Sequence, residues 1–175
     1  MQRIVVSDTT AITHLAKIRL LHILQGLYEE ILIPEAVHKE LSQVNPGQVG
    51  ALQVLNAKWI KVVAVKDKLL VSRLRTSLDP GESEAIALAV EKGANVLIID
   101  EVKGRQVARQ LLPKIIGMGG ILIEAKRAGI IESVKPHLLN LKATDFRMSD
   151  QLVEVILKEA GEAMMGNSAG ASGKP

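Results

Sequence analysis

The sequence contains no cysteine and only three aromatic residues, which are Tyr28, Trp59 and Phe146. The absence of cysteine excludes disulfides, zinc–thiolate sites, iron–sulfur clusters and a cysteine nucleophile. A platform on which several nucleic-acid bases stack needs more exposed aromatic side chains than this chain has. The hydrophobic core must therefore be built almost entirely from aliphatic side chains.

The sequence also lacks long apolar runs. None reaches the roughly 18 residues that a membrane-spanning helix requires. The chain passes from Met1-Gln2-Arg3 to Asp8 with only three apolar residues between, so the apolar stretch of a signal peptide is absent. The net charge of +3 permits an anionic partner without requiring one. We therefore expect a cytoplasmic protein that does not bind a membrane.

Hydrophobic residues make up 47% of the 175 residues, enough for one compact domain with a sizeable core. The last residues differ, because from Gly166 onward almost no apolar side chains remain and no periodicity is present. We expect a single domain over residues 1–162 and a flexible tail over residues 163–175.

Short apolar runs alternate with helical patterns along the chain. The runs are continuous, which is typical of strands that are buried on both faces in a parallel sheet. The order predicts an α/β fold, a doubly wound central parallel sheet of four to five strands flanked by helices. Two of the helices fall between the second and third strands. The predicted strands are 4–6, 31–33, 60–63, 96–99 and 114–116, and the predicted helices are 15–24, 34–44, 49–55, 83–92, 102–112, 121–128 and 151–160.

Two aspartates follow predicted strands directly. Asp8 comes after the first strand and Asp100 after the fourth. In open parallel sheets, ligands bind outside the carboxyl ends of the strands, near the point where strand order reverses. The alternative is that each aspartate only caps the following helix. Glu101 is a further candidate at the same strand end.

A third carboxylate, Glu40, lies at the margin of the apolar face that Val37, Leu41 and Val44 form on one predicted helix. A partly desolvated carboxylate there requires a cation. The alternative is a residue at the rim of the helix that is paired to a nearby lysine.

The fourth candidate is in the segment from Asp79 to Ala89. Asp79, Pro80 and Glu82 have the spacing of a capping box, which gives Glu82 a structural role. Residues two apart on a helix are separated by about 200° of rotation, so Glu82 and Glu84 cannot both face one crevice well. We favour Glu84 as the functional residue, with Glu82 second. Two solvated carboxylates in a first helical turn are the alternative.

Carboxylates gathered at one place raise each other's pKa unless a cation is present. Oxygen ligands of this kind suit Mg²⁺ or Mn²⁺. The four histidines do not have the spacing of a cluster that would bind a softer metal. A divalent cation among carboxylates can polarise a phosphodiester and lower the pKa of a water molecule for in-line hydrolysis. The histidines are His14, His22, His38 and His137.

Five stretches, in this order, resemble the PIN domain, the fold of VapC-type toxin ribonucleases, and more narrowly a prokaryotic group of PIN-like proteins. They are VVSDTT at 5–10, IPEAVHKEL at 33–41, GESEAIALA at 81–89, LIIDE at 97–101 and GMGGIL at 117–122.

The resemblance implies cleavage of single-stranded RNA at an acidic Mg²⁺ or Mn²⁺ site. By motif position, the residues that bind the metal and carry catalysis would be Asp8, Glu40, Glu84 and Asp100. It also implies the toxin of a toxin–antitoxin pair, with an antitoxin protein as partner, and a homodimer. The apolar residues that suit either a core or such an interface are Ile12, Leu15, Leu20, Leu21 and Leu24.

Substrate-binding candidates come from nearby positions. We assign this role to Thr9, Lys103 and Arg105. The alternative for Thr9 is a cap of the first helix, and the alternative for the two basic residues is a solvated helix face. Other basic residues that suit an RNA path are Arg109, Lys126 and Arg127.

Two departures from the family pattern favour a second hypothesis. Glu84 stands where many PIN domains carry aspartate, and Met118 stands where relatives commonly carry threonine or serine. The alternative is therefore a weakly active or inactive PIN-like module that binds nucleic acid or protein. A haloacid-dehalogenase-type phosphatase is disfavoured, because its second aspartate would stand at Thr10.

Overall fold

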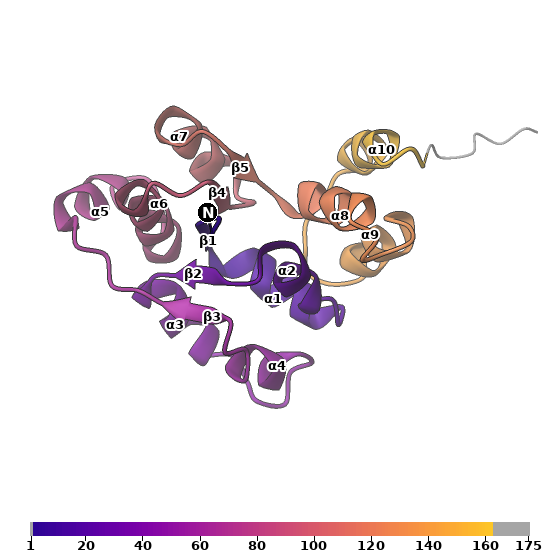
Figure 1. Cartoon of the computed structure of the whole chain (residues 1–175), viewed down its shortest axis with the longest axis horizontal. Coiled ribbons are helices and arrows are strands. Elements are labelled where there is room, and N and C mark those ends of the chain that lie inside the picture. Colours follow the sequence, from indigo (N-terminus) through magenta and orange to yellow (C-terminus); the bar gives the residue numbers. More distant parts are fainter. Residues whose placement is uncertain (1, 163–175) are drawn as a thin grey trace, which may run out of the picture.

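The computed structural model describes residues 2–162. Helices surround a central sheet of five parallel strands (Figure 1). The strand order is β3-β2-β1-β4-β5, and each neighbouring pair is parallel. All five predicted strands are confirmed. They are β1 (Val5–Ser7), β2 (Ile31–Ile33), β3 (Ile60–Val62), β4 (Val96–Ile98) and β5 (Ile115–Ile116).

Helices flank this sheet, and the predicted α/β fold is confirmed. Two helices lie between β2 and β3, as the sequence predicted. Among residues 2–162, no helix has both the length and the apolar character needed to cross a bilayer. The helices are α1 (Thr9–Lys17), α2 (His22–Tyr28), α3 (Glu35–Ser42), α4 (Ala51–Leu55), α5 (Lys68–Leu74), α6 (Pro80–Lys92), α7 (Val102–Leu111), α8 (Met118–Arg127), α9 (Lys135–Lys142) and α10 (Asp150–Glu159).

The described residues form three more helices than the seven predicted, and some begin earlier than predicted, namely α1 at Thr9, α6 at Pro80 and α8 at Met118. The single helix expected over 15–24 is two helices, because the chain turns at Arg19, which has a φ of 61°. Two short helices, α5 and α9, were not predicted. The tail expected over residues 163–175 lies outside the described residues.

Two aliphatic clusters bury opposite faces of the sheet. Val5, Val96 and Ile98 pack into a cluster with residues of α1, α2 and α8. The alternate strand residues, Val6 and Leu97, pack with residues of α5, α6 and α7. The sheet therefore separates these two sets of helices, as Figure 1 shows. The five residues that suited either a core or a dimer interface all belong to the first cluster: Ile12, Leu15, Leu20, Leu21 and Leu24.

The sheet topology places the carboxyl ends of β1 and β4 side by side. Ser7, the last residue of β1, is in register with Ile98, the last residue of β4. Strand order reverses here, because β2 lies on one side of β1 and β4 on the other. This is the place where open α/β sheets form a ligand-binding crevice.

Candidate functional site

Asp8 follows β1 and is held by the sheet. Its backbone N–H donates to the Ile98 carbonyl oxygen at 3.0 Å. Its carboxylate Oδ1 accepts from the Thr10 N–H at 3.2 Å and so caps α1. The side chain is 2% exposed, and burial raises its pKa well above the usual value, with the charges of Asp100 and Glu82 adding to the shift. Asp8 therefore caps α1 and also belongs to a group of carboxylates that act on one another, which we call the acidic cluster: Asp8, Glu40, Glu82 and Asp100.

Asp100 follows β4 and contacts the start of α8. Its Oδ1 accepts from the Met118 N–H at 2.7 Å. Its Oδ2 is buried and has no hydrogen-bond partner among the described residues. Burial raises the Asp100 pKa, although the Met118 N–H and the nearby Arg105 charge oppose that shift. Glu101, and not Asp100, caps α7 by accepting from the Gly104 N–H at 3.1 Å.

Glu40, on α3, points toward the first turn of α6. Its carboxylate accepts a hydrogen bond from the Thr9 hydroxyl. A methyl group added at Gly81 would lie 2.6 Å from Glu40 Oε1, so glycine permits this close approach. In the described part of the chain, Glu40 has no ion-pair partner, unlike the lysine-paired residue that was its alternative.

Glu82, on α6, lies in the same acidic region. It forms the predicted capping box, in which Asp79 Oδ1 accepts from the Glu82 N–H at 2.8 Å. The side chain is 8% exposed. Burial raises its pKa to about 7, and the charges of Asp79, Glu101 and Glu40 contribute to that shift. The charge of Glu82 in turn raises the pKa of Asp8.

Glu84 lies elsewhere. Its Oε2 accepts a hydrogen bond from the Ala36 N–H at 2.9 Å, near the start of α3. The helix N-cap there is Pro34, which has no side-chain acceptor for the free N–H groups of the first turn. Glu84 supplies that acceptor from another helix. The contacts thus favour Glu82 over Glu84 as the α6 carboxylate of the site. Because Pro34 has no side-chain acceptor, its position before α3 indicates that another part of the chain must accept from the free N–H groups there.

Among the described residues, no lysine, arginine or histidine forms an ion pair with the acidic cluster, although the Arg105 charge lowers the pKa of Asp100. The five ion pairs between described residues involve none of Asp8, Glu40, Glu82 and Asp100, and none involves Glu84 outside the cluster. The oxygen donors and the unpartnered Asp100 Oδ2 fit a hard divalent cation. Within residues 2–162, however, no three His, Cys, Asp or Glu side chains form a group that could hold a metal ion. The donor chemistry fits, but a closed ligand set is not formed.

A family model for the PIN domain matches residues 4–162. This chain belongs to the PIN domain family. Among curated proteins, none matches the chain. Membership indicates a nuclease-like fold, since PIN domains are in general metal-dependent nucleases that act on nucleic acid.

The substrate-binding candidates of this PIN domain have different surroundings. Thr9 contacts Glu40, and Arg105 donates from Nη1 to the Ile99 carbonyl oxygen at 3.1 Å. Arg105 therefore holds a positive charge at the Asp100 edge of the cluster. Lys103 is exposed on the first turn of α7. Lys126, suggested for an RNA path, instead pairs with Glu162 at 2.9 Å.

Met118 occupies the position where the resemblance implied a hydroxyl. Its side chain is 1% exposed and belongs to the first aliphatic cluster. Only its backbone N–H reaches Asp100. In this PIN domain, a backbone donor therefore orients Asp100, and the residue 118 side chain contributes to the core.

Proposed function

We propose that this PIN domain is a metal-dependent endoribonuclease that hydrolyses phosphodiester bonds in single-stranded RNA. The observation that supports this most directly is the pair of buried aspartates at adjacent strand ends. Asp8 and Asp100 have raised pKa values, and no lysine or arginine among the described residues pairs with either. Burying two like charges is unfavourable, and the pKa of Asp100 stays raised although the Arg105 charge and the Met118 N–H oppose that shift, so the arrangement suits a bound cation.

The residues that would hold Mg²⁺ or Mn²⁺ are Asp8, Asp100, Glu40 and Glu82. Glu82 takes the place of Glu84 in this set, because the charge of Glu82 acts on Asp8, whereas Glu84 accepts a hydrogen bond from the Ala36 N–H. Such an ion would offset charge on the phosphodiester and lower the pKa of an attacking water molecule. The chain's own residues position the site. The Met118 N–H orients Asp100, and the Thr9 hydroxyl orients Glu40.

The test is cleavage of single-stranded RNA in Mn²⁺ by the full chain and by matched variants. We expect the Asp8→Asn/Asp100→Asn double variant to lose activity and Glu82→Gln to be strongly reduced. Glu84→Gln is the control, because it removes the same charge from the same helix and its side-chain oxygen still accepts from Ala36. Equal cleavage by the native chain and the double variant would overturn this site. Loss of activity in Glu84→Gln with full activity in Glu82→Gln would restore Glu84 as the functional residue.

The biological part of the proposal is that the chain is the toxin of a toxin–antitoxin pair, acts in the cytoplasm and forms a homodimer. This part is supported by the resemblance to VapC-type toxins. Expression of the native chain should arrest growth, and expression of the double variant should not. Sedimentation measures whether the chain forms a dimer. The dimer interface must be formed by other residues than the five apolar ones of α1, α2 and the turn between them, because those five are buried in the core.

A second candidate function is a PIN module that binds nucleic acid or protein without cleaving. The burial of Met118 favours it, since no side-chain hydroxyl is present at that position. Calorimetry with Mn²⁺ separates the two functions. The nuclease must bind the ion through Asp8 and Asp100, whereas a pure binding module has no such requirement.

A further inference from the structure

A groove of about 550 Å³ begins beside Asp100 and extends between α7 and α10. We call it the α7–α10 groove. Its size is in the range of ligand-binding clefts in proteins. Three arginines line it, which are Arg105, Arg109 and Arg147, together with the aromatic ring of Phe146. The acidic residues along it are Asp100, of the acidic cluster, and Glu159 on α10.

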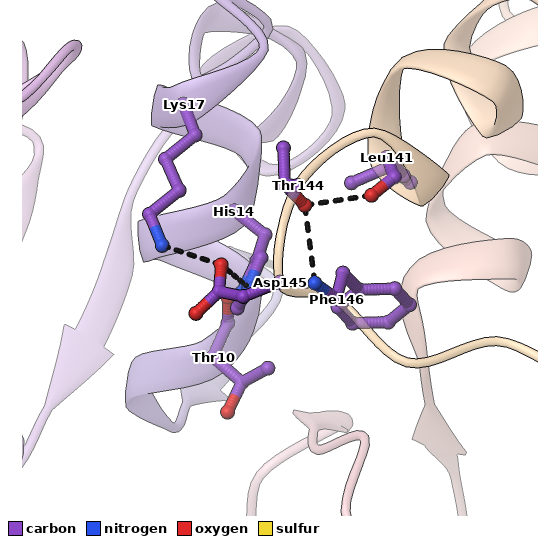
Figure 2. A network of polar contacts seen from close by, with 7 residues as sticks. All are labelled: Thr10, His14, Lys17, Leu141, Thr144, Asp145 and Phe146. Carbon is purple, nitrogen blue, oxygen red and sulfur yellow. Dashed lines mark hydrogen bonds and ion pairs between the residues drawn. The ribbon is translucent and has the colours of Figure 1, made fainter.

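One wall of the groove is a loop that is fixed to α1. Asp145 accepts from the Lys17 ammonium at 2.7 Å and lies 3.2 Å from His14 Nε2 (Figure 2). The Phe146 N–H donates to Thr144 Oγ1 at 3.1 Å, and the Phe146 and His14 rings meet edge to face at 5.0 Å. Because Asp8 caps the same helix, these contacts hold the loop in a defined place relative to the acidic cluster.

The charges along the groove suit a nucleic-acid backbone. Arg109 and Arg147 are exposed, and neither forms an ion pair with any described residue. Arginine binds phosphate oxygens with a planar set of donors, and such contacts position a strand. Arg105 lies at the end of the groove that is beside Asp100, since it donates to the Ile99 carbonyl oxygen and its charge lowers the pKa of Asp100.

Phe146 adds a feature that selects among nucleic acids. The residue is partly exposed and lines the groove. An aromatic ring stacks on the face of an unpaired base, whereas in a duplex both faces of an internal base are covered by its neighbours. A single aromatic residue is too few for a platform, but it is enough to hold one base near the cluster.

We propose that the α7–α10 groove binds single-stranded RNA, with Arg109 and Arg147 on its phosphates and Phe146 stacked on one base. The proposal rests on the proposed function. It adds the path of the RNA, which would run past α10 and the 146–148 loop toward Asp100. An acidic peptide from a protein partner would also bind the arginines, but it would have no flat base to stack on the partly exposed Phe146 ring.

The test is binding of a fluorescently labelled RNA oligonucleotide to the full chain in EDTA, measured by anisotropy over a range of salt concentrations. Arg109→Ala and Arg147→Ala should each weaken binding about fivefold and reduce the salt slope by about 0.7. Arg73→Ala is the matched control, because Arg73 is an exposed arginine on α5, outside the groove. It should leave affinity and slope unchanged.

Phe146 is tested by substitution with leucine, which keeps apolar contact with the core that Phe146 packs against. Phe146→Leu should weaken binding of a single strand about tenfold and leave binding of a duplex of the same sequence unchanged. Melting temperatures of all variants check that the fold is retained.

Several results would overturn the proposal. Groove variants that bind RNA like Arg73→Ala would exclude the groove as the strand's path. Equal losses on single strand and duplex in Phe146→Leu would exclude stacking. Because binding is measured without divalent ions, the groove and the nuclease proposal can fail separately. If RNA binds through the groove but is never cleaved, the groove proposal stands and the nuclease proposal fails. If RNA is cleaved but neither Arg109→Ala nor Arg147→Ala affects the cleavage, the nuclease proposal stands and the groove proposal fails.

Discussion

The Glu84 carboxylate on α6 accepts a hydrogen bond from the Ala36 N–H on α3 at 2.9 Å. This bond joins two helices that are separated by about fifty residues of sequence. It satisfies a donor of the first turn of α3, where Pro34 provides no capping side chain. The same helix that presents Glu82 to the acidic cluster is thereby fixed against the helix that carries Glu40.

Removal of the Glu84 acceptor should therefore destabilise the protein. We expect Glu84→Ala to lower the free energy of unfolding by about 1 kcal/mol, the usual cost of losing a cap. Glu84→Gln should cost less, because its amide oxygen still accepts from Ala36. Urea denaturation measures both variants. Equal stability of the alanine variant and the native chain would show that this bond contributes nothing.

The parallel sheet could be predicted from the sequence because its strands are buried on both faces. Such strands form continuous apolar runs rich in β-branched residues, like Val96 to Ile99, and these runs can be recognised without knowledge of distant parts of the chain. The break between α1 and α2 was not predictable in this way. The apolar spacing continues across Arg19, where the backbone adopts a positive φ without a glycine to signal it.

The choice between Glu82 and Glu84 shows why the site was harder to predict than the fold. Local spacing indicated that the two side chains cannot both face one crevice well. Which one does so depends on the rotation of α6 relative to the sheet and on the position of the α3 N-terminus. Both are tertiary relationships. The capping box also suggested a purely structural role for Glu82, but a capping side chain near other carboxylates still contributes its charge to them.

Gly81 allows Glu40 to approach the first turn of α6. In an exposed helix, alanine in place of glycine would stabilise by up to about 1 kcal/mol. Here the added methyl would lie 2.6 Å from Glu40 Oε1, so the carboxylate must move. We expect Gly81→Ala to lower RNA cleavage at least tenfold with little gain in stability. Gly47→Ala is the control, because the nearest atom to its added methyl is at an ordinary 3.5 Å. Full cleavage by Gly81→Ala would show that the position of Glu40 is unimportant.

The raised pKa of Glu82 makes stability depend on pH. In the folded protein its pKa is about 7, against 4.5 for an ordinary glutamate, and burial is the main cause. The unfolded chain therefore loses this proton at lower pH than the folded chain, so stability falls as pH rises from 4.5 to 7. Allowing for solvent screening at a first helical turn, we expect the loss to be about 2 kcal/mol. Chemical denaturation across this range in EDTA should show a smaller decline for Glu82→Gln. An unchanged decline would assign it to other groups.

Glu162 should stabilise the packing of α8, α9 and the end of α10. Its carboxylate accepts from the Val134 N–H at 2.8 Å and from the Lys135 N–H at 3.2 Å, at the start of α9. It also pairs with Lys126 at 2.9 Å. We expect Glu162→Ala to lower the free energy of unfolding by about 2 kcal/mol, because a charged acceptor of several N–H groups is lost. Glu154→Ala, on the exposed side of α10, is the comparison and should change stability little.

Asp8 should lower stability in the absence of a divalent cation. Its pKa is raised first by burial and then by the charge of Asp100, so ionisation at neutral pH is unfavourable. Asp8→Asn removes that charge, and its amide oxygen can still accept from the Thr10 N–H that caps α1. In EDTA at pH 7.5 we therefore expect Asp8→Asn to melt at a higher temperature than the native chain.

Addition of Mn²⁺ should reverse this order. The native chain gains stability by mass action, about 2.7 kcal/mol at a concentration one hundred times the dissociation constant. Asp8→Asn has lost a ligand and should gain much less. Glu84→Gln, which loses the same charge outside the cluster, should respond to Mn²⁺ like the native chain. Equal Mn²⁺ responses in the native chain and Asp8→Asn would mean that the buried aspartates do not bind the ion. In that case their repulsion would need another source of compensation, and the nuclease proposal would lose its main support.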